Sequence, residues 1–173
     1  MNRYQRQLQV KQTQINYLLE LTEAINSNAK IPVLFRMYRE FLEDKLQIKR
    51  MAFFSIEQGD PMCKTYIGIR PDEIQDDLYT ELFKYTKAST IAEPHSAFLG
   101  QFDLIIPCQH KEMPIAFVLI SNPEINDEFM NNIKFISTIT NIISVAIENK
   151  RLFKSQVKQG IMAKEMELAN NMQ

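Results

Sequence analysis

The last third of the chain carries a helical pattern that is too long to fit inside one small domain. Residues 123–173 contain one Gly and no Pro after their first residue, and Phe129, Ile136 and Ile143 recur at heptad spacing. Beyond residue 148 the apolar positions become sparse. A helix of this length outruns an ordinary domain, so we expect its second half to lie outside the core and to act as a linker.

A second amphipathic helix is predicted at the start of the chain, over residues 3–28. Its apolar side chains alternate at three- and four-residue spacings, as in a coiled-coil seam that only Lys11 interrupts. Pro32 disfavours helix at the residue before it, so we expect a loop at residues 26–32 and a further helix over 32–46.

The middle of the chain changes to short runs of aromatic and β-branched residues, which favour strands. We predict one hairpin from residues 50–57 and 62–69, and another from residues 102–110 and 114–122. Residues 70–89 between them return to helical spacing. Hairpins build antiparallel sheets, so the predicted class is α+β, with a central antiparallel sheet and long terminal helices.

Composition narrows the classes of function. The net charge of -1 gives no sign of a nucleic-acid or membrane partner, and no apolar run approaches the length needed to span a bilayer. Two cysteines in 173 residues suit a reducing compartment better than a disulfide framework. We therefore expect a cytoplasmic protein that neither binds nucleic acid nor inserts into a membrane.

Motifs for the common catalytic chemistries are absent. The four glycines form no phosphate-binding loop, and there is no HExxH or CxxC sequence. Carboxylates on the predicted helices lie near Lys and Arg, as on a solvated surface. The sequence favours a binding or signalling module over an enzyme, with no catalytic residue and no cofactor beyond an unknown small ligand.

Three segments resemble the GAF family of small sensor domains. They are residues 18–60, with the entering helices and first strand, residues 104–122, with the second hairpin, and residues 128–153, with the exit helix. The exit helix carries the A..N..L ending of GAF-like domains through Ala146, Asn149 and Leu152.

The resemblance implies an antiparallel sheet with helices on both faces and a role in ligand-regulated signalling. The cyclic-nucleotide signature of some members, Asn-Lys-Phe-Asp-Glu, is not present. The Cys-His pair that holds a bilin is also missing, because Lys64 follows Cys63 and Gln109 follows Cys108. The resemblance therefore implies neither of those ligands.

Residues 164–173, KEMELANNMQ, resemble the linker that opens the catalytic domain of serine/threonine phosphatases of the stage II sporulation protein E type. The acidic residue of that linker is matched by Glu165 and Glu167, its Leu-Ala pair by Leu168 and Ala169, and its Gln by Gln173. The resemblance implies a sensor fragment whose metal-dependent phosphatase follows downstream. A histidine kinase or nucleotide cyclase is an alternative output domain, and this chain itself is expected to lack phosphatase activity.

Aromatic and polar residues on the predicted strands are candidates for a ligand pocket. One sheet face has to cover the helices, while the other has room for a small molecule beneath residues 90–101. Core packing explains the same aromatic residues without any ligand, and a pocket filled by its own side chains is a further alternative. The candidate ligand contacts are Phe53, Ser55, Tyr66, Phe98 and His110.

A metal or redox site is the rival hypothesis. Cys108 and His110 are two residues apart on a predicted strand, so their side chains share a face, and Cys63 or His95 would have to complete the ligand set. Cysteines inside apolar strands are commonly just small buried residues.

The terminal helices carry the clearest functional signal. We predict three segments: a signalling and dimerisation helix (1–30), a GAF-like domain (31–148) and an exit helix or linker (149–173). Their apolar stripes predict a parallel homodimer, the alternative being a helix pair within one chain. The predicted interface is Leu8, Ile15, Leu18, Ile25, Ile143, Ile147, Val157 and Ile161.

Overall fold

One antiparallel sheet of five strands forms the centre of the computed structural model, which describes residues 2–74, 77–94, 96–121 and 127–171. The strand order is β2-β1-β5-β4-β3, so the long strands β1 and β5 pair at its middle. The strands are β1 (Arg50–Glu57), β2 (Asp60–Ile67), β3 (Ser89–Thr90), β4 (Leu104–His110) and β5 (Met113–Ser121).

Both predicted hairpins are present, with tighter turns than the sequence indicated. Gln58 and Gly59 join β1 to β2 with φ angles of 53° and 86°, and Lys111 and Glu112 join β4 to β5 with φ angles of 52° and 64°. Positive φ at both turn residues matches the right-handed twist of the flanking strands. The first hairpin therefore resumes at Asp60 instead of residue 62.

The helices follow the predicted order, and local sequence accounts for their ends. The Asn2 side chain accepts a hydrogen bond from the Gln5 backbone, while the Gln5 side chain accepts one from the Asn2 backbone, which caps the first helix. Pro32 lies in the first turn of the second. The helical segments are α1 (Arg3–Asn26), α2 (Ile31–Glu40), a π-helical turn (Phe41–Lys45), α3 (Asp77–Leu82) and α4 (Asp127–Asn171), with 3-10 turns at Pro71–Glu73 and Leu99–Gln101.

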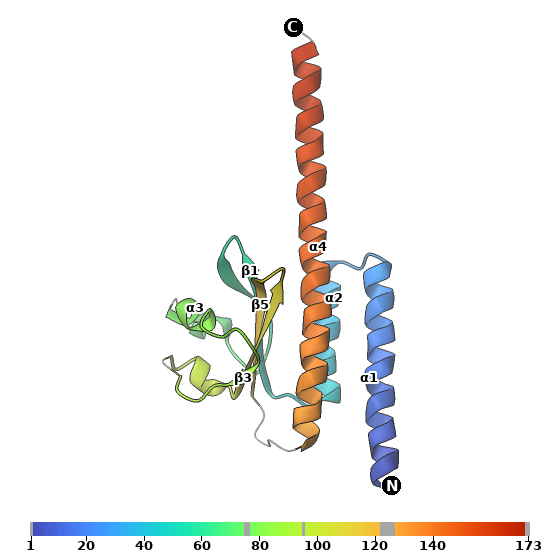
Figure 1. The fold of residues 1–173 in the computed structure, drawn as a ribbon, viewed down its shortest axis with the longest axis vertical. Helices are drawn as coiled ribbons and strands as arrows, with labels where there is room; N and C mark the ends of the chain where they lie inside the picture. Colours follow the sequence, from blue (N-terminus) through green and yellow to red (C-terminus); the bar gives the residue numbers. More distant parts are fainter. Residues whose placement is uncertain (1, 75–76, 95, 122–126, 172–173) are drawn as a thin grey trace.

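The sheet face covered by α2 and α4, here called the bundle face, holds the larger core. It includes Met51, Phe53 and Val118 of the sheet, together with Leu34 of α2 and Ile143 of α4. α1 contacts α2 and α4 and lies on their far side from the sheet (Figure 1). Inside this core the Thr140 hydroxyl donates to the Ile136 carbonyl at 2.6 Å, and the Tyr38 hydroxyl donates to Thr140 Oγ1 at 2.7 Å.

The opposite sheet face, here called the loop face, is covered by α3 and by the segment that precedes β4. Ala52, Phe54 and Phe117 of the sheet pack there against Leu82 of α3 and Phe98. The predicted helix over 70–89 is reduced to the six residues of α3 and a separate turn at Pro71–Glu73. With helices on both faces, the fold class is α+β, as predicted.

Gly68 ends the first hairpin at a place where no side chain fits. Its φ angle is 65°, and a Cβ built there would lie 2.2 Å from the backbone oxygen of Lys49. We expect Gly68→Ala to lower the free energy of unfolding by at least about 2 kcal/mol, because both the left-handed backbone and the backbone contact oppose it. Urea unfolding measures this, with Gly59→Ala as a control for the cost of positive φ, since nothing lies within 4 Å of a Cβ at Gly59. Equal losses in the two variants would contradict the role given to the Lys49 contact.

Candidate functional site

The helix α4 divides into a buried and an exposed half. Its first half is held by side chains such as Phe129, Ile143 and Ile147, which are 5%, 0% and 2% exposed. Every residue from 152 to 171 is exposed, and this part, to which the name exit helix is restricted from here on, projects beyond the rest of the molecule (Figure 1). Twenty residues of helix extend about 30 Å. Among the described residues, no helix has the length and apolar composition needed to cross a membrane.

The exit helix carries an exposed apolar stripe on one face. We call Phe153, Val157, Ile161 and Leu168 the exit stripe; they are 66%, 46%, 55% and 57% exposed, and their spacings of four, four and seven residues align them. A surface groove of about 440 Å³ lies between Ile25, at the end of α1, and Ile142, Ala146 and Asn149 of α4. The spacing of seven from Ala146 to Phe153 continues this groove into the exit stripe.

α1 also has an uncovered half. Its only buried side chains are Tyr17 and Leu21, so the first half of the helix contributes none to the core. We call the exposed apolar residues Tyr4, Leu8, Ile15 and Leu19 the entry stripe; all four are at least half exposed. Because α1 and α4 run in the same direction, the entry stripe lies beside the first half of α4 and the exit stripe lies past the end of α1 (Figure 1).

The predicted interface residues fall into three groups. Leu8, Ile15, Val157 and Ile161 are exposed, as an interface with a second chain requires. Leu18 and Ile25 are half-buried against the core of their own chain, whereas the neighbouring Leu19 is exposed. The prediction was wrong for Ile143 and Ile147. Both are buried against the sheet, so they stabilise one chain and present no surface to another.

The candidate ligand contacts are not brought into one pocket. Phe53 is 1% exposed on the bundle face, with its ring centre 5.1 Å from that of Phe35 and 5.4 Å from that of Tyr38. Ser55 is 4% exposed, and its hydroxyl accepts a hydrogen bond from Arg151 of α4. Phe53 therefore packs against α2, and Ser55 contacts α4.

The other three candidates lie elsewhere. Phe98 is buried on the loop face, where its ring packs against Phe54 and Phe102. Tyr66 pairs across the strands with Ala52, whose side chain lies on the loop face, so the Tyr66 side chain is directed towards the loop face as well. Tyr66 is 43% exposed. His110 is half-buried at the end of β4, beside the β4–β5 turn. On the loop face, aromatic and aliphatic side chains of the chain itself occupy the space that the sequence suggested for a ligand.

The two cysteines lie on opposite faces of the sheet. Cys108 is buried in the core of the bundle face, while Cys63 packs against the core of the loop face. Burial raises the pKa of the Cys63 thiol to about 11 and that of the Cys108 thiol to about 12. No three His, Cys, Asp or Glu side chains gather as a metal site in the described residues, and His95 lies outside them.

These raised pKa values predict two slow thiols. The thiolate is the reactive form, so at pH 7.5 we expect Cys63 and Cys108 to react with iodoacetamide more than about a hundredfold more slowly than a free thiol. The raised pKa values also make the free energy of unfolding depend on pH, because the native state keeps both thiol protons up to a higher pH than the unfolded chain does. The contribution of the two thiols is complete below the unfolded pKa near 9 and is lost as the pH rises towards 11 and 12. Rapid labelling of folded protein at pH 7.5 would contradict this account and favour the redox hypothesis.

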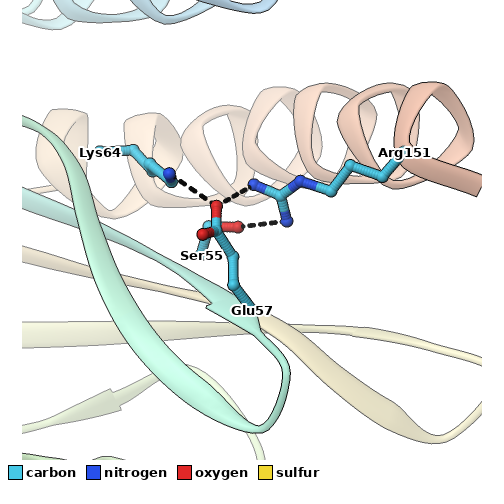
Figure 2. A network of polar contacts seen from close by, with 4 residues as sticks. All are labelled: Ser55, Glu57, Lys64 and Arg151. Carbon is cyan, nitrogen blue, oxygen red and sulfur yellow. Dashed lines mark hydrogen bonds and ion pairs between the residues drawn. The ribbon is translucent and has the colours of Figure 1, made fainter. Parts of the chain in front are cut away.

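A polar contact that sequence reasoning missed anchors α4 just below the exit helix. The Arg151 guanidinium donates one hydrogen bond to Ser55 Oγ at 2.9 Å and pairs with the Glu57 carboxylate through its other nitrogen. Lys64 Nζ of β2 lies 2.6 Å from the same Glu57 oxygen. Figure 2 shows both cations directed at this carboxylate from different elements. Only the fold brings the four residues together, so no sequence spacing reveals the contact.

The fold matches solved structures, although the sequence gives no match of its own. No family model and no curated protein matches this sequence. The GAF domain of an Acinetobacter phosphoenolpyruvate-protein phosphotransferase superposes with a TM-score of 0.59 at 12% identity, over 88% of this chain and 97% of that one. This chain has a GAF-like fold.

Two other solved structures agree with the GAF-like assignment. The GAF domain of the Coxiella burnetii phosphoenolpyruvate-protein phosphotransferase gives a TM-score of 0.60 at 14% identity, over 83% of this chain and 98% of that chain. A GAF domain/HD domain protein from Geobacter sulfurreducens gives 0.54 at 13% identity, over 74% and 98%. At these identities the similarity concerns the fold alone.

Proposed function

We propose that this GAF-like chain is a non-catalytic cytoplasmic sensor domain that dimerises through its terminal helices and passes a signal along the exit helix to an effector. The observation that carries the proposal is the exit helix itself. It is exposed throughout residues 152–171 and carries the four apolar side chains of the exit stripe. Isolated helices of this length are marginal in water, and packing of an apolar stripe is the usual source of their stability. A second copy of the chain supplies that packing.

The proposed dimer has contacts at two levels. Near the N-terminus, the entry stripe of one chain packs beside the corresponding part of its partner. Past the end of α1, the two exit stripes pair as parallel helices. The groove between Ile25 and Ile142 lies between these levels, so a continuous apolar seam runs along the bundle. Parallel pairing is proposed because it brings the two exit helices to their effectors at the same end.

The proposed effector is a metal-dependent serine/threonine phosphatase. Its support is the likeness of residues 164–173 to the linker of stage II sporulation protein E-type enzymes. Residues 172–173 of this segment lie outside the part of the chain that the structure describes. Proteins with similar folds include phosphotransferases and an HD-domain protein, so GAF domains accompany different catalytic units. A histidine kinase or a cyclase stays the alternative. A reading frame that continues past Gln173 into a phosphatase domain is expected; an unrelated domain there would overturn this part of the proposal.

Sedimentation equilibrium tests the dimer. We expect a mass of about twice the 20.3 kDa of one chain at micromolar concentration. A strict monomer at the highest concentrations that stay soluble would contradict the proposal. The measurement uses the whole chain, so the contribution of both stripes is included.

A specific observation favours one variant of this function, in which the domain responds to a protein partner instead of a small molecule. The loop face is filled by Phe54, Phe98 and Phe117, which are at most 2% exposed. A small ligand would have to displace these side chains from a packed core. A thermal-shift screen of metabolites is expected to find no stabilising compound; a stabilising compound that loses its effect in Phe98→Ala would reverse this preference.

A further inference from the structure

Two neighbouring residues of α4 make polar contacts where the exit helix begins. Lys150 and Arg151 are consecutive on α4 but contact different elements. Lys150 Nζ donates to Asn28 Oδ1 at 2.5 Å, in the loop between α1 and α2. Arg151 binds Ser55 and Glu57 on β1, and Glu57 also pairs with Lys64 on β2 (Figure 2). We call this set the polar collar: Asn28, Ser55, Glu57, Lys64, Lys150 and Arg151.

The polar collar marks a sharp change in how α4 is held. One turn before it, Ile147 is 2% exposed and packs in the core of the bundle face. One residue after it, the helix is exposed on all sides. The side chains of Glu57 and Arg151 are 30% and 28% exposed, and a groove of about 580 Å³ opens beside them. Water and salt reach such ion pairs, so they separate far more easily than the apolar contacts below.

We propose that the polar collar is the switchable joint that couples the β1–β2 hairpin and the α1–α2 loop to the exit helix. The proposal rests on the proposed function and adds its regulation. When the polar collar is closed, the hairpin, the loop and the first turn of the exit helix move as one unit. When Arg151 leaves Glu57, the exit helix turns or bends above Ile147 while the core below stays packed.

Two routes of input meet at this joint. A partner that moves α1 acts through Asn28 on Lys150, and a contact at the sheet edge acts through Glu57 on Arg151. Coupling of this kind is reciprocal, so loosening the helix side must also loosen the hairpin side. That reciprocity distinguishes a joint from a simple anchor for the helix.

Hydrogen exchange of the whole chain, followed by mass spectrometry, tests the proposal. In Arg151→Met and in Glu57→Gln, we expect amides of residues 148–156 to exchange about five- to tenfold faster than in the unaltered chain. By reciprocity, amides of the β1–β2 turn exchange faster in Arg151→Met as well. Amides of residues 136–146 keep their protection, because the core that holds them is unchanged. Raising the salt concentration reproduces part of the effect in the unaltered chain.

Lys154→Met is the matched control, because it removes an exposed cation less than one turn further along the same helix. It is expected to leave exchange at residues 148–156 unchanged. Equal exchange in Arg151→Met and the unaltered chain overturns the joint, as does faster exchange confined to the helix. The contacts all lie within one chain, so repeating the measurement in the Val157→Glu background separates a failed joint from a failed dimer.

Discussion

Val157→Glu is expected to raise the dissociation constant of the dimer by at least about a hundredfold. Val157 is 46% exposed in one chain and lies in the middle of the exit stripe. Each dimer contains the substitution twice, and each copy loses the burial of an apolar side chain and faces the burial of a carboxylate. Together these losses cost about 3 kcal/mol or more, which is about two powers of ten in affinity. Sedimentation equilibrium at several concentrations gives the dissociation constants of the unaltered chain and of the variant.

Met166→Glu is the matched control for this experiment. Met166 is 66% exposed, and nine residues at about 100° each place it on the opposite side of the exit helix from Val157. Its dissociation constant should stay within about threefold of that of the unaltered chain. Circular dichroism shows whether either variant changes the helix content. Equal weakening by the two substitutions would mean that the exit stripe has no special part in association.

Phe53→Ala is expected to lower the free energy of unfolding by about 3–5 kcal/mol. Phe53 was a candidate ligand contact, but its ring packs edge-on against Phe35 and Tyr38 and is 1% exposed. Removing it leaves a cavity between the sheet and α2 that neighbouring side chains fill only in part. Urea denaturation monitored by far-ultraviolet circular dichroism measures the loss.

Tyr66→Ala on the neighbouring strand serves as the comparison, since Tyr66 is 43% exposed. We expect it to cost no more than about 1 kcal/mol, because much of its ring already contacts water. Were Phe53→Ala to cost as little as Tyr66→Ala, the ring of Phe53 would be lining an open pocket and its ligand role would return.

Periodicity was enough to predict the elements whose apolar residues repeat without interruption. The stripe of α4 from Phe129 to Ile147 and the alternation in β1 gave their types and approximate positions. α3 was overestimated because Ile74 and Tyr85 fit the helical spacing but lie outside the helix, next to short turns. Three-residue spacing alone does not show where backbone hydrogen bonds stop.

The sequence could not show which half of α4 is buried and which half is exposed. Ile147 and Val157 look alike in a heptad pattern, and only the position of the sheet decides that one is core and the other surface. Arg151 is a further case: its partners lie 94 and 96 residues away in the chain. A single sequence holds no signal for such a contact, because the charge of one Arg among many fits a solvated surface equally well.

Parallel pairing of the exit helices is the central claim, and pulsed electron paramagnetic resonance tests it most directly. A spin label is attached to Ser155→Cys in one sample and to Ala169→Cys in another; the unaltered chain, whose own thiols we expect to react slowly, gives the background. Parallel helices predict similar short distances between the two chains in both samples, since the axes of paired helices lie about 10 Å apart. In a mixed dimer with one chain of each kind they predict a longer distance, because the two sites are about 21 Å apart along the helix. In an antiparallel pair the mixed distance does not exceed the longer of the other two, and that result, or no distance between chains, would contradict the claim.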